Sequence, residues 1–307
     1  MKVIANRFKV IFPKLISQEQ AGFIAGRNIS NNIILAQEVI HSMRCNQKGR
    51  KWMAIKLDLE KAYGKVSWEF ISASLVAAKT PVFLRNAIMS AISSSSMQIL
   101  WNGVPTQKFI PNRRIRQGCP LSPYLFVLCM EWLGHFIRTK IETGNWVPIC
   151  LSRTDPPVSH LFFADDLVIF YKAQLDQARL LDIILTQFCE VSGHRISVRK
   201  SNIFFWNTET DVRNQISQLF RFQEVRNLGT YLGVLLLHDR VTKNTLSFIM
   251  DKVRKKLQSW DAKKLSIAGR ITLAQSVLLF IPNYFMQSLM ISKGVSADIE
   301  RLVRQLI

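Results

Sequence analysis

The sequence has few acidic residues for its length. Its 307 residues include 21 Asp and Glu but 41 Lys and Arg, which gives a formal net charge of +20 at pH 7. A surface with so little negative charge attracts polyanions. Nucleic acid is therefore the leading partner that composition suggests, although a ribosomal protein or a protein at a membrane surface could show the same excess. Sequence motifs are needed to distinguish between these classes of protein.

Paired cysteines and long apolar runs are also missing. The cysteines form no CxxC pair and the histidines show no zinc-binding spacing, so neither a disulfide framework nor a zinc site is expected. The longest apolar stretch, residues 124–137, is interrupted by Glu131 and is shorter than the ~20 residues that a membrane-spanning helix needs. No continuous apolar segment follows Met1, so no secretory signal is predicted. We expect an intracellular protein, nuclear or cytoplasmic, without a membrane partner.

The apolar pattern predicts a mixture of helices and strands in the first part of the chain. Apolar residues at helical spacing predict a helix over residues 30–43, and Ser30 can cap its N-terminus. Over residues 53–59 the period changes to two, which predicts a strand with one buried face. Asp58 belongs to the opposite face of that strand.

Two later segments carry turns and acids. Residues 113–123, RRIRQGCPLSP, form a basic, turn-rich loop, and Ser122 followed by Pro123 predicts the start of a helix. Residues 160–171, HLFFADDLVIFY, place two adjacent acids between short apolar runs. This pattern predicts a hairpin with these acids, Asp165 and Asp166, at its tip.

Three carboxylates could form a metal site. Desolvation and mutual repulsion both oppose the ionisation of adjacent carboxylates, and a bound cation would remove this cost. A solvated turn is the simpler interpretation of an isolated pair such as Asp165 and Asp166. Asp58 adds a third acid from a separate strand, and three carboxylates on neighbouring strands can hold two magnesium ions roughly 3.5–4 Å apart. Such ions would activate a primer 3′-hydroxyl and stabilise the leaving pyrophosphate.

Six motifs follow one another along the chain: QAGFIAGRNISNNIILAQEVI, KLDLEKAYGKVSW, RQGCPLSPYLF, FADDLVIF, SGHRISVRKSNIFF and YLGVLL. In this order they resemble the reverse transcriptases of non-LTR (LINE-type) retroelements, especially those of plants. The resemblance implies an α+β fold, a right-hand polymerase core with an antiparallel-sheet palm. It implies partial fingers over residues 1–50, a palm with the remaining fingers elements over residues 51–238, and a partial helical thumb over residues 239–307.

The resemblance also implies an activity and a set of site residues. The activity is RNA-directed DNA polymerisation with two Mg²⁺ ions, an RNA template, a DNA primer and deoxynucleotide triphosphates. Asp58, Asp165 and Asp166 would be the metal-binding acids. Tyr63 would be the aromatic gate against ribonucleotides, with a half-buried helix aromatic as the plainer alternative.

Further roles come from other motifs. Gln117 and Gly118 match a loop that contacts the incoming nucleotide and the template, although a basic surface turn fits them too. Lys200 matches a lysine near the leaving pyrophosphate, where an ammonium could donate a proton or neutralise charge; a solvated surface lysine is equally compatible. Arg27 and Asn28 match a template-binding fingers segment or a plain capping loop.

The C-terminal part resembles the thumb of the same family. Apolar periodicity predicts one helix over residues 249–260 and a second over residues 266–282, with basic residues that would grip the duplex backbone. Trp260 and Tyr284 could stack on bases, but at helical spacing such residues are more often part of the core.

The chain departs from the family pattern at two positions and at both ends. Gly64 stands where the family commonly has Asp, and Arg114 stands where members often have Gly. The chain also resembles a fragment truncated at both ends, without the first fingers motifs, the upstream endonuclease or the downstream Cys/His segment. Because the early fingers help to hold the triphosphate, we expect little or no polymerase activity from this chain alone.

Two other functions stay open. A non-catalytic remnant would keep the fold and bind nucleic acid through its basic surface. A group II intron maturase shares the palm and the adjacent acids, but such proteins more often have YADD where this chain has FADD. The sequence indicates neither which RNA is copied nor the oligomeric state.

Overall fold

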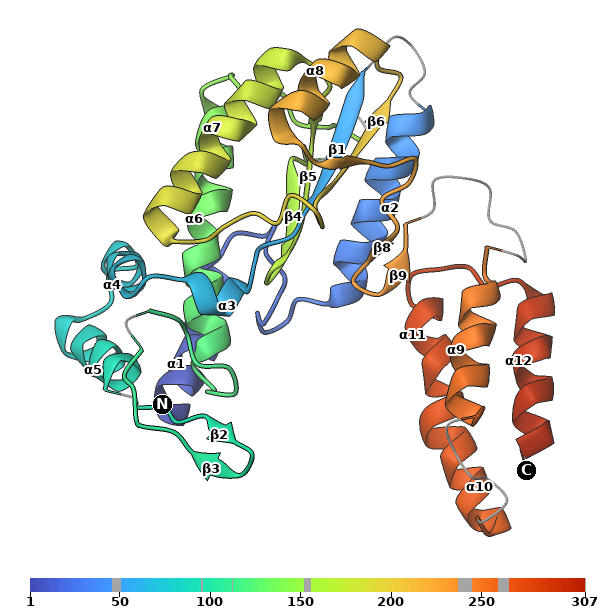
Figure 1. Ribbon diagram of the computed structural model, residues 1–307. Helices are drawn as coiled ribbons and strands as arrows, with labels where there is room; N and C mark the ends of the chain where they lie inside the picture. Colours follow the sequence, from blue (N-terminus) through green and yellow to red (C-terminus); the bar gives the residue numbers. More distant parts are fainter. Residues whose placement is uncertain are drawn as a thin grey trace.

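A central sheet lies between helices, and a lobe of helices from the C-terminal part of the chain stands beside it (Figure 1). The computed structural model describes residues 1–45, 51–94, 96–111, 113–151, 156–236, 245–258 and 265–306. The helices are α1 (Lys2–Leu15), α2 (Ile29–Cys45), α3 (Ala62–Lys65), α4 (Trp68–Ala77), α5 (Val82–Ser93), α6 (Ser122–Glu142), α7 (Leu175–Ser192), α8 (Thr210–Phe220), α9 (Ser247–Gln258), α10 (Ile267–Leu273), the π-helical turn η2 (Ala274–Leu278), α11 (Phe280–Met286) and α12 (Lys293–Leu306).

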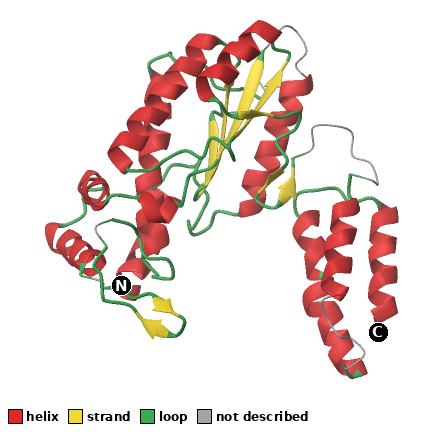
Figure 2. Ribbon diagram, in the orientation of Figure 1, coloured by secondary structure: helices red, strands yellow, loops and turns green. Residues whose placement is uncertain are grey.

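The central sheet has five strands in the order β4, β5, β1, β6, β7. Strand β1 runs antiparallel to both β5 and β6, and β7 joins the edge of β6 in parallel. Two small hairpins, β2–β3 and β8–β9, lie outside this sheet (Figure 2). The strands are β1 (Trp52–Leu57), β2 (Leu100–Trp101), β3 (Val104–Pro105), β4 (His160–Phe163), β5 (Asp166–Lys172), β6 (Asn202–Trp206), β7 (Gln223–Glu224), β8 (Thr230–Tyr231) and β9 (Val234–Leu235).

Strand β1 is buried on both faces. Met53 and Ile55 belong to a core shared with α4, α6 and α7, whereas Ala54 belongs to a second core on the α2 side of the sheet. The prediction of one buried face was therefore wrong. The reason is that α2 packs its apolar side over the face that alternation had assigned to solvent, and the small Ala54 allows this close approach.

The predicted hairpin and the predicted helices before and after β1 are confirmed, but the residue that precedes each helix differs from the predicted capping residue. Strands β4 and β5 form the hairpin with the two acids at its turn. Helix α6 begins at Ser122, with Pro123 in its first turn, and Ser122 donates its hydroxyl proton to the Arg116 carbonyl. Helix α2 is capped by Asn28, whose Oδ1 accepts a bond from the Ser30 N–H at 3.2 Å, rather than by Ser30 itself.

The C-terminal lobe consists of α9–α12 around its own core. The helix predicted over residues 266–282 is present as the continuous helical run α10, η2 and α11, in which η2 is a π-helical turn. Val234 of the β8–β9 hairpin and Ile33 of α2 complete the core of this lobe. Tyr284 is partly buried and donates a hydrogen bond of 2.5 Å to the Leu232 carbonyl, whereas Trp260 lies outside the described residues.

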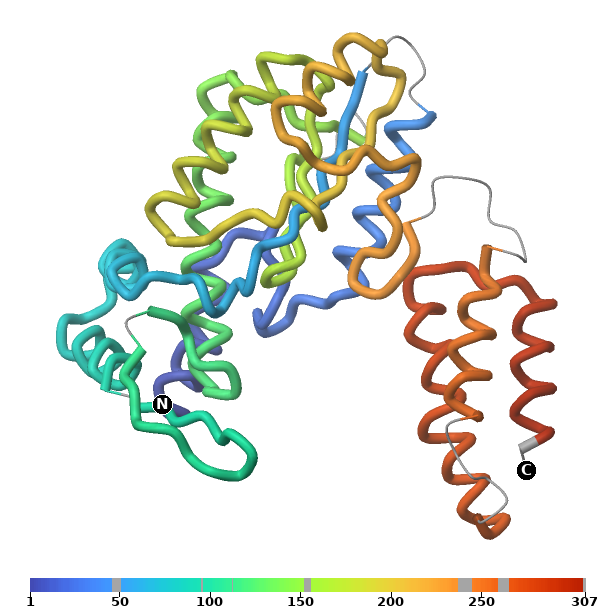
Figure 3. The backbone as a smooth tube through the Cα atoms, viewed as in Figure 1, coloured from blue at the N-terminus to red at the C-terminus, as the bar shows by residue number. Residues whose placement is uncertain are grey.

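The chain is an α+β protein whose sheet carries helices on both faces. The described chain has no helix that combines the length and the apolar character needed to cross a bilayer. Figure 3 shows the N-terminus beside the β2–β3 hairpin and the C-terminus at the far end of the helical lobe. The predicted domain boundaries at residues 50 and 238 fall outside the described residues and stay predictions.

Candidate active site

Three acids lie at one end of the central sheet. Asp58 directly follows β1, Asp165 lies in the β4–β5 turn, and Asp166 is the first residue of β5. The antiparallel register pairs Leu57 with Leu167, so the next step along the same register brings Asp58 opposite Asp166. Facing residues on antiparallel strands have Cα atoms about 4.5–5.5 Å apart. The sheet therefore brings together acids that are more than a hundred residues apart in sequence.

The charges of these acids act on one another. The pKa of Asp166 is raised, first because its surroundings are desolvated and second because Asp165 is negatively charged. Lys56 opposes this shift, while the negative charge of Asp58 adds to it. The protein alone therefore does not offset the repulsion among the three carboxylates, which is the electrostatic condition that favours a cation.

A buried glutamine holds the turn that carries Asp165. Gln20 is 1% exposed, and its Oε1 accepts bonds from the N–H groups of Gly22 at 2.8 Å and Ala164 at 2.9 Å. Ala164 has a φ of 55°, a left-handed conformation that an L-residue rarely adopts. A Cβ on Gly22 would lie 2.4 Å from the Ala164 nitrogen, so only glycine fits beside this turn.

Sequence reasoning missed the roles of Gln20 and Gly22. Both belong to the QAGF segment of the first motif, but no periodicity or charge pattern connects them with the acids. The connection is made by backbone pairing between residues 19–21 and β4: Phe162 donates to the Glu19 carbonyl at 2.8 Å, and Ala21 donates to the Phe162 carbonyl at 2.9 Å.

Five of the predicted site residues line one open cleft of about 670 Å³. They are Asp58, Tyr63, Gln117, Asp165 and Lys200. The Lys200 Nζ lies 3.9 Å from Asp58 Oδ1, and its side chain is 73% exposed. Lys200 is thus an exposed cation at the edge of the acidic group, in a position to meet a negatively charged ligand.

Tyr63 forms part of the wall of the cleft. Its ring stacks on Phe126 of α6, with centroids 4.4 Å apart and an angle of 18° between the planes. Burial, followed by the negative charge of Asp165, raises the pKa of Tyr63 to about 12. The phenol therefore stays neutral at physiological pH and presents a fixed ring to whatever enters the cleft.

The loop before α6 is tied to the Tyr63 segment. The N–H of Ile115 donates to the Tyr63 carbonyl at 2.8 Å, and the N–H of Arg114 donates to the Val66 carbonyl at 3.0 Å. These bonds fix the loop, so that Gln117 faces the cleft. Gly118 has a φ of 85° and lines a neighbouring cavity of about 460 Å³ instead.

Arg27 and Asn28 are outside the residues that line the cleft. The Arg27 guanidinium donates to the backbone carbonyls that follow α1, including the Ile16 carbonyl at 2.6 Å. It also donates to the carbonyls of Ser17 and Gln20. Arg27 thus holds the segment that leads to Gln20 and Asn28 caps α2, while template binding by these two residues stays a prediction.

A preformed metal-ligand cluster is not observed. Over the residues described, no group of three or more His, Cys, Asp or Glu side chains is arranged closely enough to hold a metal ion. The metal-binding role of the three acids consequently stays a prediction, which their proximity and mutual repulsion favour.

Known families and proteins resemble this chain. A family model described as "Reverse transcriptase (RNA-dependent DNA polymerase)" matches residues 1–236. The chain is 25% identical over 274 residues to the transposon TX1 uncharacterized 149 kDa protein of Xenopus laevis, covering 88% of this chain and 20% of that protein. It is 28% identical over 145 residues to a Pol polyprotein from the type-1 retrotransposable element R2 of Popillia japonica, covering 47% of this chain and 23% of that protein.

A shorter relative and a solved structure complete the comparison. An uncharacterized mitochondrial protein of Arabidopsis thaliana is 36% identical over 104 residues, covering 34% of this chain and 84% of that protein. A structure of apo telomerase from Candida tropicalis superposes with a TM-score of 0.49 at 10% identity, covering 68% of this chain and 40% of that one. The chain spans about a fifth of the length of the TX1 and R2 proteins.

Proposed function

Because the chain belongs to the reverse transcriptase (RNA-dependent DNA polymerase) family, in its non-LTR (LINE-type) group, we propose that its cleft joins deoxynucleotides to a DNA primer on an RNA template. The observation that carries the proposal is the meeting of Asp58, Asp165 and Asp166 at one end of the sheet, beside a cleft large enough for a nucleotide. The basic composition of the chain suits both nucleic-acid strands.

The three acids would hold two magnesium ions. Carboxylate oxygens are the ligands that magnesium prefers, and the pKa of Asp166 is raised first by desolvation and then by the negative charge of Asp165, both of which a bound cation would offset. When bound, the two ions would supply Lewis-acid activation of the primer 3′-hydroxyl and stabilisation of the departing pyrophosphate. The protein itself holds Asp58 at the end of β1 beside the β4–β5 turn, and Gln20 supports that turn through its bond to Ala164.

Lys200 and Tyr63 would act on the nucleotide itself. The exposed Lys200 ammonium can neutralise the phosphates and give a proton to the leaving pyrophosphate. The Tyr63 ring, fixed against Phe126, would exclude the 2′-hydroxyl of a ribonucleotide by contact. Gln117 and Gly118 would position the incoming nucleotide and the template base from the loop that is bonded to Tyr63.

A non-catalytic nucleic-acid-binding remnant is the second candidate. It is favoured by the absence of a preformed metal-ligand cluster among the described residues. It would retain the basic surface while the acids served no chemical purpose.

Primer extension on an RNA template, with magnesium and deoxynucleotide triphosphates, distinguishes the two candidates. Because little activity is expected from this chain alone, the polymerase proposal predicts only weak incorporation, which Asp165→Asn abolishes and Asp182→Asn, a change on α7, leaves intact. Salt-dependent RNA binding that is unaffected by Asp58→Ala, without any synthesis, would select the remnant.

A further inference from the structure

The β2–β3 hairpin exposes apolar side chains on both of its faces. Every residue from 98 to 110 is exposed. Among them, Leu100 is 71% exposed, Trp101 is 73% exposed and Val104 is 67% exposed. Soluble proteins seldom leave a contiguous apolar patch uncovered unless it serves as an interaction site. A two-stranded hairpin that is not packed on a core is also only marginally stable by itself.

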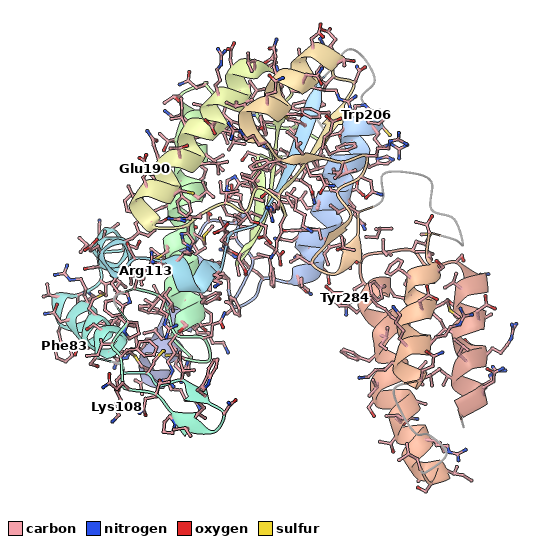
Figure 4. All side chains as sticks on the ribbon, in the orientation of Figure 1. Phe83, Lys108, Arg113, Glu190, Trp206 and Tyr284 are labelled. Carbon is pink, nitrogen blue, oxygen red and sulfur yellow. The ribbon has the colours of Figure 1, made fainter. Side chains whose placement is uncertain are left out.

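The sequence around the hairpin contains no acidic residue. Between Glu69 and Glu131 there are six Lys and Arg and no Asp or Glu. One of these cations, Lys108, is exposed on the hairpin (Figure 4), whereas Arg113 shares a pocket with Trp68 and Glu69. An exposed aromatic ring and an exposed lysine on one hairpin that carries no acidic residue suit unpaired nucleic acid, because bases can stack on the ring while phosphates meet the ammonium group.

The hairpin begins at the edge of the catalytic cleft. Met97, directly before it, and Arg114 and Arg116, directly after it, all line that cleft. Its two ends are joined by backbone bonds between Met97 and Phe109, both 2.9 Å long. A strand that leaves the cleft on this side would therefore meet the hairpin next.

We propose that the β2–β3 hairpin binds the unpaired template strand that extends beyond the cleft, with Trp101 as the base-stacking platform. The Asn102–Gly103 turn, with φ angles of 49° and 83°, closes the hairpin and places Trp101 at its tip. The inference rests on the proposed function, because it requires a primer–template duplex in the cleft. A protein partner would also cover the apolar side chains, but a segment that has cations and no acidic residue favours a polyanion.

Equilibrium binding to labelled RNA–DNA duplexes tests this proposal without requiring synthesis. Two duplexes of equal length are compared by fluorescence anisotropy, one blunt and one with an unpaired 5′ extension of the RNA strand, without nucleotides. We expect the wild-type chain to prefer the extended duplex. Trp101→Ala should remove that preference, weakening binding of the extended duplex by roughly tenfold, and Trp101→Phe should keep most of it.

Phe83 provides a matched control. It is an exposed aromatic residue, 86% exposed, in the same acid-free segment, but it lies on helix α5, at the left edge of the view in Figure 4. Phe83→Ala should leave both affinities unchanged. Lys108→Gln should reduce the salt dependence of binding to the extended duplex, in which one phosphate contact contributes about 0.7–0.9 to the slope, whereas Lys79→Gln should not.

Three results would overturn the proposal. The first is a wild-type chain that binds the two duplexes equally. The second is a Trp101→Ala variant that weakens both duplexes alike or neither. The third is a wild-type chain that self-associates in gel filtration and becomes monomeric through Trp101→Ala, because the hairpin would then be a protein interface. If the chain prefers the extended duplex but shows no synthesis in the primer-extension assay, the catalytic proposal is refuted and binding of the template by the hairpin still holds.

Discussion

Arg114 and Gly64, the two residues that depart from the family pattern, have opposite backbone environments. Arg114 has a φ of 96°, a region in which glycine is favoured over any L-residue. Gly64, in contrast, lies in α3, and a Cβ added there would meet only the Lys61 Cβ at an ordinary 3.6 Å. The glycine that relatives often carry at position 114 therefore has a conformational reason, and a side chain at position 64 is sterically acceptable.

The backbone at position 114 predicts an unusual order of stabilities. Arg114→Gly and Arg114→Ala both remove the guanidinium, but only glycine relieves the positive φ. At most positions glycine lowers stability relative to alanine; here we expect Arg114→Gly to be more stable than Arg114→Ala by about 1 kcal/mol. Urea unfolding measures the difference. An alanine variant as stable as the glycine variant, or more so, would contradict the assigned conformation.

The close packing of Gly22 against the β4–β5 turn predicts different effects for two glycine-to-alanine changes. Gly22→Ala would force its Cβ against the Ala164 nitrogen, so we expect a loss of about 1–3 kcal/mol as the turn or the residue 19–22 segment shifts. Gly64→Ala should be neutral or slightly stabilising, because Ala favours helix more than Gly does. Thermal unfolding of both variants tests this contrast. Equal effects at the two positions would show that Gly22 is not packed as described.

The sequence identified the three acids and allowed them to converge, but it gave no indication of the residues that support them. Strand alternation and the hairpin pattern only allowed Asp58 to approach Asp165 and Asp166; the family resemblance implied that they meet, and the register of β1 and β5 brings Asp58 opposite Asp166. Gln20 gave no such signal, because its importance lies in two hydrogen bonds to a turn that is far away in sequence. Periodicity within a segment indicates the secondary structure of that segment. It does not indicate which distant segment will form hydrogen bonds with it.

At the level of helices and strands, the sequence-based prediction was wrong where a second element covers a face that was expected to be exposed. Alternation in β1 predicted one buried face, but α2 buries the second. The packing partner, which a single segment does not reveal, decides the outcome. The helix predicted over residues 266–282 is present, and apolar periodicity did not indicate its π-helical turn η2.

The contact between Tyr284 and the β8–β9 hairpin predicts how the helical lobe is attached. Tyr284→Phe removes the bond to the Leu232 carbonyl and keeps the ring, so about 1 kcal/mol of local stability should be lost. Hydrogen exchange should become faster in α11 and at Gly233, while β1, buried on both faces, keeps its protection. Exchange that accelerates equally throughout the chain would show that the lobe does not open separately.

At the scale of the whole molecule, two buried histidines predict an acid-sensitive fold. Burial lowers the pKa of His160 and that of His194 from 6.5 to about 4. Between these pH values the unfolded chain binds more protons than the folded chain, so the free energy of unfolding should fall as the pH decreases from about 6.5 to about 4. The loss should approach about 1.4 kcal/mol per pH unit for each histidine.

Chemical unfolding at a series of pH values measures this slope. His194→Asn should remove the contribution of His194 to the pH dependence of the free energy of unfolding, because asparagine does not titrate. A free energy of unfolding that stays constant across this interval, or rises toward low pH, would contradict the burial of these imidazoles.

The dependence of stability on magnesium shows whether the three acids form one cation-binding site. Without divalent ions, Asp166→Asn should stabilise the fold, because it removes a carboxylate whose pKa is raised by burial and by its neighbours. Magnesium at about a hundred times its dissociation constant should stabilise the wild-type chain by about 2.7 kcal/mol. Asp58→Asn, Asp165→Asn and Asp166→Asn should each abolish most of this gain, whereas Asp182→Asn, an acid on α7 whose pKa burial also raises, should keep it. A magnesium effect that survives all three cleft substitutions, or that is absent from the wild-type chain, would contradict the account.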